Sequence, residues 1–90
     1  MYLNKRKAKC LEVLTLRVKV HAKNAATERA TSGQYGESWD ICEGAHLAIQ
    51  AVLGDREAAD ILNESRSISE GYQEAIDTLG FYGIDIGSLI

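Results

Sequence analysis

The residues best suited to chemistry stand together in the segment CEGAH, which begins at Cys42. On a helix, Cys42 and His46 lie one turn apart, and Glu43 and His46 have the Glu-x-x-His spacing of carboxylate-bridged metal sites in helical bundles. Such sites need two of these motifs and two further carboxylates, whereas this chain has one motif. A zinc site that joins Cys42 and His46 to Cys10 and His21 can also be written, but these residues lack the spacing of a zinc finger.

A catalytic role for the same segment has little support. A cysteine nucleophile needs a base and an orienting group, and His46 could serve Cys42 only on a helix face that borders a cleft. The sequence contains no G-x-S-x-G motif, phosphate-binding loop or dinucleotide fingerprint. We therefore predict a protein that is not an enzyme and has no cofactor, with His46 as a partly buried helix residue. The alternative is a metal site at Cys42, Glu43 and His46.

Length and composition describe the scaffold that must carry any site. The 90 residues suffice for one domain, 1–90, and no proline interrupts it. Two cysteines do not make a disulfide framework, and no apolar run approaches the roughly 20 residues that span a bilayer. The sequence predicts a soluble cytoplasmic protein with no membrane partner. Because a domain this small buries little surface, we expect self-association to help stabilise it.

The basic N-terminal segment, 1–30, predicts one long helix. From residue 3 onward it contains neither Gly nor Pro, and Leu11, Leu14 and Val18 fall on one face at helical spacing. A second apolar stripe lies on nearly the opposite face, and a small bundle can cover only one of the two. We predict that this second stripe is the interface of a homodimer. It consists of Val13, Leu16 and Val20.

The same segment permits a different fold. The stretch LTLRVKVH alternates apolar and polar residues, which is the pattern of a half-buried strand. The alternative is an α+β fold in which a strand at 11–20 pairs with the apolar C-terminal tail, 81–90. We favour an all-α bundle, with one long N-terminal helix and three shorter ones, because Ala, Lys and Arg on both sides of this stretch favour helix.

The helical region 37–80 contains a repeated sequence motif. ESWDICEGAHLAI, which begins at Glu37, and ESRSISEGYQEAI, which begins at Glu64, agree at seven of thirteen positions. Each copy has a glycine inside a predicted helix and an alanine four residues later, a spacing that lets two helices approach closely. We also predict Ser38 as the N-cap of the first of these helices. The predicted helix-packing residues are Gly44, Ala48, Gly71 and Ala75.

Charge is divided unevenly along the chain. Residues 1–29 carry a net charge of +6 and residues 30–90 a net charge of −9. Carboxylates at helical spacing form an acidic surface, and a single Trp is either a core residue or an interface anchor. We predict a non-catalytic protein-binding module, a small accessory or inhibitor protein of the kind that phages encode against host defence nucleases. The predicted partner-binding residues are Glu57, Asp60, Glu64, Glu70, Glu74, Asp77 and Trp39.

The basic segment supports an alternative function. Clustered Lys and Arg are typical of phosphate contacts in nucleic-acid-binding proteins. The one segment that resembles a helix-turn-helix, AIQAVLGDREAADIL, has an acidic second helix, which is the wrong charge for a recognition helix. The alternative is therefore a regulator that binds nucleic acid through its N-terminal segment, unless that segment simply lies against the acidic one. Its contact residues would be Lys5, Arg6, Lys7, Lys9, Arg17 and Lys19.

Overall fold

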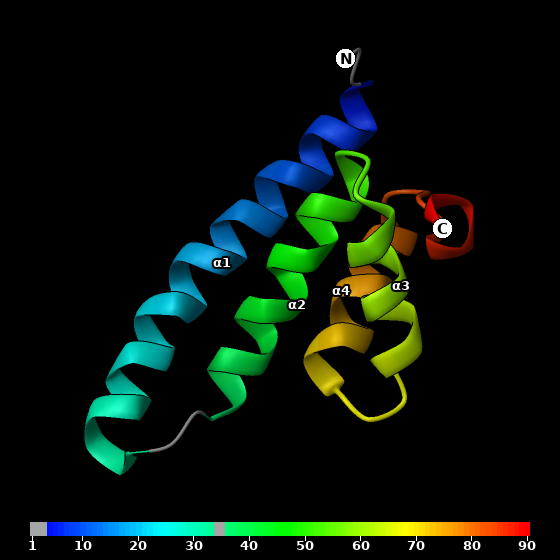
Figure 1. The fold of residues 1–90 in the computed structure, drawn as a ribbon. Helices are drawn as coiled ribbons and strands as arrows, with labels where there is room; N and C mark the ends of the chain where they lie inside the picture. The colour runs from blue at the N-terminus through cyan, green and yellow to red at the C-terminus, as the bar shows by residue number, and fades with distance from the viewer. Residues whose placement is uncertain (1–3, 34–35) are drawn as a thin grey trace.

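The computed structural model describes residues 4–33 and 36–90. Within them the chain forms four α-helices and a short 3-10 helix, and Figure 1 shows α2 in the middle of the bundle, with α1 on one side and α3 and α4 on the other. The predicted all-α fold, with one long helix followed by three shorter ones, is confirmed. The elements are α1 (Lys5–Ser32), α2 (Glu37–Val52), α3 (Arg56–Ser65), α4 (Glu70–Phe81) and η1 (Ile86–Leu89).

Helix α1 is one uninterrupted helix of 28 residues. Asn4 caps its start, because its side chain accepts a hydrogen bond from the backbone N–H of Lys7 at 2.8 Å. The helix ends at Gly33, whose φ of 75° lets its N–H bond to the carbonyl oxygen of Arg29. The alternative strand at 11–20 is wrong, since these residues lie in the middle of α1. Strong helix formers on both sides outweigh the alternating pattern.

Helix α2 starts differently from the prediction. Side-chain caps begin α3 at Asp55 and α4 at Ser69, but the N-cap of α2 is Gly36, which has no side chain. Ser38 lies inside α2 and is buried, so the predicted Ser38 cap is wrong. Its hydroxyl instead donates a hydrogen bond to Oε1 of Glu28 at 2.9 Å. A side chain of α1 therefore anchors the first turn of α2 by a hydrogen bond.

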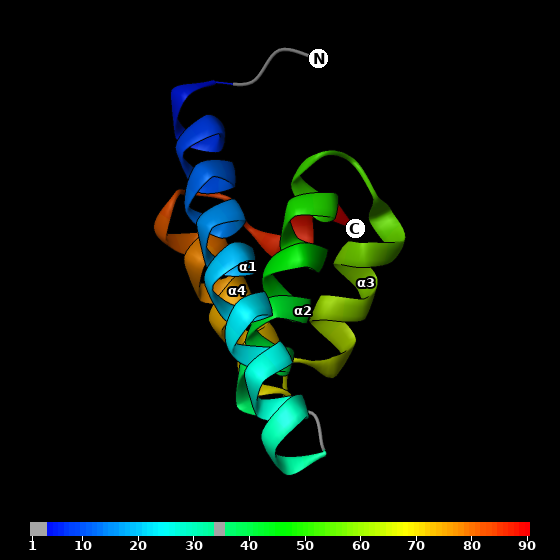
Figure 2. The same cartoon turned by 90° about the vertical axis from the view of Figure 1, so that its left-hand side faces the viewer.

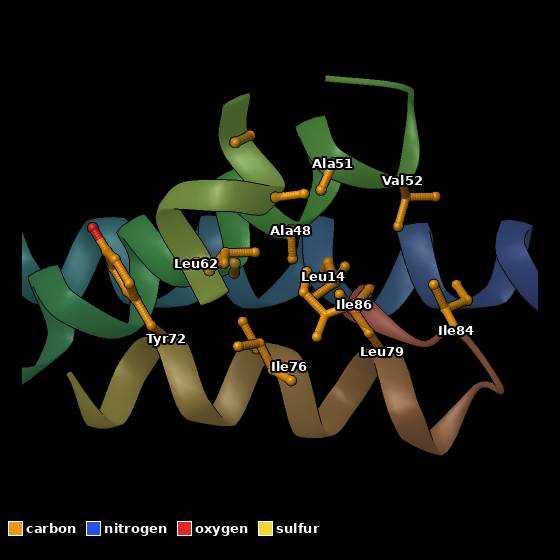
Figure 3. Packing of buried hydrophobic residues seen from close by; sticks show 14 of the residues in the cluster. Leu14, Ala48, Ala51, Val52, Leu62, Tyr72, Ile76, Leu79, Ile84 and Ile86 are labelled. Atoms are coloured by element: carbon orange, nitrogen blue, oxygen red, sulfur yellow. The ribbon is translucent and has the colours of Figure 1, made fainter. Parts of the chain in front are cut away.

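The core between the helices is small and rich in alanine (Figure 3). Its large, fully buried side chains are Leu14 of α1, Leu62 of α3 and Leu79 of α4. Alanine lets the helices pack closely but removes little apolar area from water, so each buried residue contributes less than a larger side chain would. The buried alanines of this core are Ala45, Ala48, Ala51, Ala58, Ala59 and Ala75.

The C-terminal tail folds back over the bundle. Gly83, with a φ of 76°, turns the chain after α4. Ile84 and Ile86 are then buried in the same core (Figure 3). Phe81, at the end of α4, points the other way and is 82% exposed. No helix in the described part of the chain is both long and apolar enough to cross a membrane.

The molecule is elongated because α1 is much longer than the other helices. At about 1.5 Å per residue its 28 residues match the longest dimension of 42 Å, whereas the other two dimensions are 24 and 19 Å. Figure 2 shows α1 running past the ends of its neighbours, with the later half of α1 beside the start of α2. Helix α1 therefore offers a long outer surface that the rest of this small bundle covers only in part.

Candidate interaction surfaces

The structure separates the three side chains of the CEGAH segment. The thiol of Cys42 points toward α1 and lies 3.7 Å from the carbonyl oxygen of Val18. The carboxylate of Glu43 accepts a hydrogen bond from the hydroxyl of Tyr72 on α4 at 2.7 Å. His46 is exposed, so the expectation that it is partly buried is wrong. Among residues 4–33 and 36–90, no three His, Cys, Asp or Glu side chains lie close enough to hold a metal ion.

Burial keeps both thiols protonated at neutral pH. Burial raises the pKa of the Cys10 thiol, and the positive charge of Arg17 opposes this only in part. Burial also raises the pKa of Cys42, and the negative charge of Glu43 raises it further. Nucleophilic cysteines have a lowered pKa, which comes from nearby positive charge or a helix N-terminus. Neither thiol has the surroundings of a nucleophile.

Helices α2 and α4 pack closely where their glycines meet. A Cβ atom on Gly44 would lie 2.5 Å from the backbone oxygen of Gly71, and a Cβ atom on Gly71 would press even closer on the backbone of Asp40. Because the obstructing atoms belong to the backbone, they cannot rotate away. Ala48 and Ala75, one turn further along the same faces, are buried. The structure thus brings the predicted packing residues Gly44 and Gly71 to one helix–helix contact, and Ala48 and Ala75 lie in the same core.

Asp40 fixes the start of α4, a role that the sequence analysis missed. Its carboxylate accepts hydrogen bonds from the hydroxyl of Ser69 at 2.7 Å and from the backbone N–H of Gly71 at 2.9 Å. The negative charge also lies at the positive end of the α4 dipole. One signal could have found it, because Asp40 precedes Gly44 by four residues and so shares the face that packs on α4.

The outer surface that α1 and α4 form together, which we call the α1/α4 face, exposes several apolar side chains to solvent. Leu16 is 62% exposed, Val20 is 48% exposed and Phe81 is 82% exposed, and Val13 is partly buried beside them. Val13 and Phe81 also line a hollow of about 430 Å³ between the two helices. The bundle therefore leaves the predicted interface stripe of α1 largely uncovered, and clustered exposed apolar residues often mark an interaction site.

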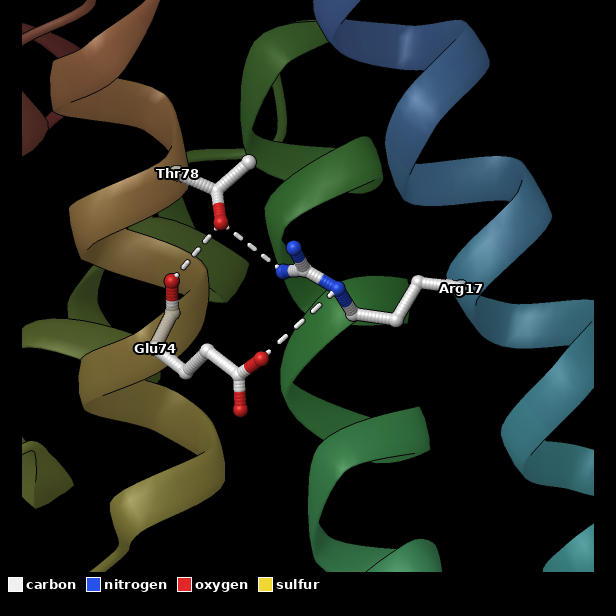
Figure 4. Close-up of polar contacts among 3 residues, drawn as sticks. All are labelled: Arg17, Glu74 and Thr78. Atoms are coloured by element: carbon white, nitrogen blue, oxygen red, sulfur yellow. Dashed lines mark hydrogen bonds and ion pairs between the residues drawn. The ribbon is translucent and has the colours of Figure 1, made fainter.

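Arg17 links α1 to α4 across this hollow (Figure 4). Its Nη1 donates a hydrogen bond to the hydroxyl of Thr78 at 2.8 Å, and its Nε lies 4.0 Å from Oε1 of Glu74. The Arg17 side chain is only 20% exposed. The structure therefore places this predicted nucleic-acid contact against the acidic segment of the same chain, where it joins two helices.

A second apolar groove, which we call the Trp39 groove, lies between α1 and α2. Trp39 is 44% exposed, so the alternative that it is a core residue is wrong. Two hollows of about 160 and 290 Å³ adjoin it, and both are lined by Trp39 and Cys42. Ala22 and Ala26 of α1 line the first hollow, and His46 lines the second. A half-exposed Trp beside an apolar hollow is typical of an interface anchor.

All six predicted partner-binding carboxylates are exposed, but they do not share one environment. On α4, Glu74 and Asp77 border the hollow of the α1/α4 face, where Glu74 lies near Arg17 and Asp77 accepts a hydrogen bond from the amide of Gln73 at 2.7 Å. Helical spacing directs the row on α3 outward to solvent. That row consists of Glu57, Asp60 and Glu64.

Four of the six predicted nucleic-acid contacts lie in the first five residues of α1, whereas Arg17 and Lys19 lie in its middle. Lys7 is partly buried, and Lys9 forms an ion pair with Glu12 at 3.6 Å. A hollow of about 410 Å³ separates this first turn from the turn after α4, and Arg6 reaches across to Gly83. The exposed members of the predicted set are Lys5, Arg6, Lys9 and Lys19.

Comparison of the chain with protein-family models, with curated proteins and with solved structures finds no match. Four surfaces of the described chain could bind a partner. They are the α1/α4 face, the Trp39 groove, the carboxylate row of α3 and the basic first turn of α1.

Proposed function

We propose that this chain is a non-catalytic protein-binding module and that the Trp39 groove holds its partner. The observation that carries the proposal is the indole of Trp39, 44% exposed and flanked by two apolar hollows. A large aromatic side chain already half buried in its own chain loses little conformational freedom when a partner covers it. An apolar side chain of the partner would fill a hollow and complete the burial of the indole.

The exposed carboxylates of α2 and α3 favour a partner with a basic surface. Glu43 lines one hollow of the groove and is exposed, Arg29 lines the other hollow, and the carboxylate row of α3 adds three negative charges on the far side of α2 (Figure 1). Opposite charges on two surfaces speed their encounter and exclude wrong partners. A nuclease presents such a basic surface to its nucleic acid. The specific form of the proposal is an accessory or inhibitor protein that covers this surface, of the kind that phages encode.

The proposal includes association of the chain with itself. The stripe formed by Val13, Leu16 and Val20 is exposed or partly exposed in the single chain. By helical spacing it lies on a different side of α1 from Val18 and Ala22, which line the Trp39 groove. A second copy on the stripe would therefore leave the groove open to another protein.

The test is capture of proteins from a nuclease-treated cell lysate on immobilised wild-type protein and on a Trp39→Ala variant. A captured protein is then purified, and its dissociation constant is measured by calorimetry. We expect Trp39→Ala to weaken binding by roughly 30-fold or more, the loss typical of an aromatic hot spot. The matched control is Ile68→Ala, which removes an apolar side chain that is 86% exposed and does not line the groove.

Two results would contradict the proposal. One is a captured protein whose affinity is the same for Trp39→Ala as for Ile68→Ala. The other is capture that occurs from an untreated lysate but not from the nuclease-treated one. Replacing the α3 row by Gln and Asn tests the charge argument separately, since binding should then become slower and less dependent on salt.

The basic first turn of α1 supports a second candidate function, nucleic-acid binding. Lys5 and Arg6 are exposed and line the hollow beside this turn, and Lys9, one turn further along α1, is also exposed. A protein that contacts several phosphates loses affinity steeply as salt rises. Fluorescence anisotropy with a short DNA duplex and a single-stranded RNA, across a series of salt concentrations, measures this directly. Binding that falls with salt and is lost in Lys5→Gln/Lys9→Gln would favour the second candidate.

A further inference from the structure

We infer that a second copy of this chain occupies the α1/α4 face, about a two-fold axis that runs parallel to the helices. In this arrangement, α1 of each copy lies along the groove between α1 and α4 of the other. The inference rests on the self-association proposed above and adds the orientation of the two copies. It does not depend on the Trp39 groove.

The first argument is that the face carries a projection and a hollow at the same height along the bundle. Leu16 projects from α1 and is 62% exposed. The hollow of about 430 Å³ beside it is lined by Val13 and Arg17 of α1, by Glu74, Asp77, Thr78 and Phe81 of α4, and by Tyr82. A two-fold axis parallel to the helices leaves every residue at its own height. Leu16 of each copy therefore comes to the hollow of the other, and one surface serves as both halves of the interface.

The second argument is that the two sides of the face carry opposite charge. Lys19 and Lys23 are exposed on α1, and Glu70 and Glu74 are exposed on α4. Figures 1 and 2 show that α1 and α4 run in opposite directions. Arg17 lies beside Glu74, so Lys23, further along α1, is level with Glu70, further back along α4.

These charges select the direction of the axis. An axis parallel to the helices brings the basic side of one copy to the acidic side of the other, and Lys23 of each copy then faces Glu70 of the other. An axis perpendicular to the helices would lay α1 against α1 in the opposite direction and would bring basic side chains together, which is unfavourable. A second copy of this chain supplies an apolar centre and both charged sides in the matching order.

The third argument is the size of the face. A stable interface takes about 800 Å² from each partner. The molecule is 42 Å long and 19 to 24 Å across, so an interface of this size must extend over most of one long side. The three side chains of the α1 stripe cannot supply that area alone. Phe81, the hollow and the charged sides of α4 must belong to it.

The test uses two single charge reversals, Lys23→Glu and Glu70→Lys, with molar mass measured by light scattering and sedimentation over about a hundredfold range of concentration. Wild type should be a dimer. Each variant alone places like charges together twice in the dimer and should self-associate roughly tenfold more weakly. An equimolar mixture should regain the wild-type affinity, because the mixed dimer has opposite charges at both positions. Leu16→Asp should be a monomer, whereas Ile61→Asp, which changes an apolar side chain that is 39% exposed on α3, should remain a dimer.

Each of the other outcomes contradicts a specific part of the dimer inference. A monomeric wild type, or a Leu16→Asp variant that remains a dimer, overturns self-association through this face. A dimer that Leu16→Asp abolishes but that the mixture does not restore overturns the parallel axis and leaves self-association standing. Circular dichroism of every variant shows whether a loss of dimer reflects a loss of fold. None of these results bears on capture of a partner at Trp39, so the two parts of the proposed function fail separately.

Discussion

Gly44 and Gly71 show how a single hydrogen atom in place of a side chain sets the distance between two helices. We expect Gly44→Ala and Gly71→Ala each to lower the free energy of unfolding by about 2–4 kcal/mol, since the new methyl group would meet backbone of the facing helix. Helix propensity alone would predict the opposite sign, because alanine favours helix over glycine by about 1 kcal/mol. Urea unfolding followed by circular dichroism measures the difference.

Gly80 provides the matched control for this experiment. It lies in α4, and a Cβ atom there would meet nothing within 4 Å. Gly80→Ala should therefore leave stability unchanged or raise it by about 0.5–1 kcal/mol. If Gly44→Ala and Gly71→Ala behave like Gly80→Ala, the close approach of α2 and α4 is wrong.

Tyr72 makes the stability of the protein depend on pH in the alkaline range. It is 8% exposed, its hydroxyl donates to Glu43 at 2.7 Å, and burial, with the hydrogen bond and charge of Glu43 and the charge of Asp40, raises its pKa to about 12. The pKa of an unfolded Tyr is about 10. The stabilisation from neutral Tyr72 is therefore complete below pH 10 and is lost as the pH rises from 10 to 12.

Titration of the tyrosinate absorbance checks this expectation. The chain has four tyrosines, and one should ionise later than the others or only as the protein unfolds. Tyr72→Phe should remove that late step and flatten the decline of unfolding free energy between pH 10 and 12. Tyr82→Phe, which alters a tyrosine outside this hydrogen bond, serves as the control. Ionisation of every tyrosine in one step near pH 10, with the fold intact, would contradict it.

At the level of single residues, the spacing of small residues predicted helix contacts better than residue type predicted exposure to solvent. The Gly and Ala positions follow from helix geometry, which the sequence contains in full. Whether His46 and Trp39 face solvent depends on where α1 and α4 stop covering α2, and that is a property of the assembled bundle. The sequence of α2 fixes the position of both residues on that helix, but it does not show which of the other helices covers each position.

Between elements, the start of α4 depends on α2. The carboxylate of Asp40 holds both Ser69 and the backbone N–H of Gly71. We expect Asp40→Ala to lower the unfolding free energy by about 1–3 kcal/mol, because it removes two hydrogen bonds to a charged group and leaves the hydroxyl proton of Ser69 and the backbone N–H of Gly71 without their acceptor. Hydrogen exchange should show the loss first in the opening turn of α4.

Asp60→Ala is the control for Asp40→Ala. It removes an exposed carboxylate from the outer row of α3 and should change stability by no more than about 0.5 kcal/mol. Equal effects of the two substitutions would show that the bridge between α2 and α4 contributes nothing.

The repeated sequence motif shows why the helices could be predicted from the sequence in large part but not completely. Its second half, with Gly44 or Gly71 inside, is helical in both copies, and the two copies pack on each other. Its first half is not equivalent, since Ile41 lies inside α2 whereas Ile68 lies in the turn before α4 and is 86% exposed. Similar local sequence therefore adopts different structures where the neighbouring elements differ. The long helix was predictable because 28 residues without Gly or Pro leave no place to stop.

For the whole molecule, the uneven distribution of charge along the chain and the uneven burial of apolar side chains both follow from how α1 and α4 are placed. The basic helix α1 and the acidic helix α4 lie side by side, joined by Arg17, Glu74 and Thr78 (Figure 4), and large apolar side chains remain exposed on the face they share. The core beneath is built largely from alanine, which limits the area that one chain can bury. A chain of this kind gains stability when a second molecule covers that face.

If self-association stabilises the fold, the melting temperature of the protein should rise with its concentration. A partner that binds the folded chain and not the unfolded one adds stability by mass action. In calorimetry over about a hundredfold range of concentration, wild type should melt several degrees higher at the top of the range, because each factor of ten in association is about 1.4 kcal/mol and a domain of this size shifts by about 4–8 °C per kcal/mol. Leu16→Asp should melt at one temperature throughout, at or slightly below that of the most dilute wild type, since an exposed Leu contributes little to the isolated fold. Concentration-independent melting of wild type would mean that the α1/α4 face remains open to solvent and that the alanine-rich core suffices alone.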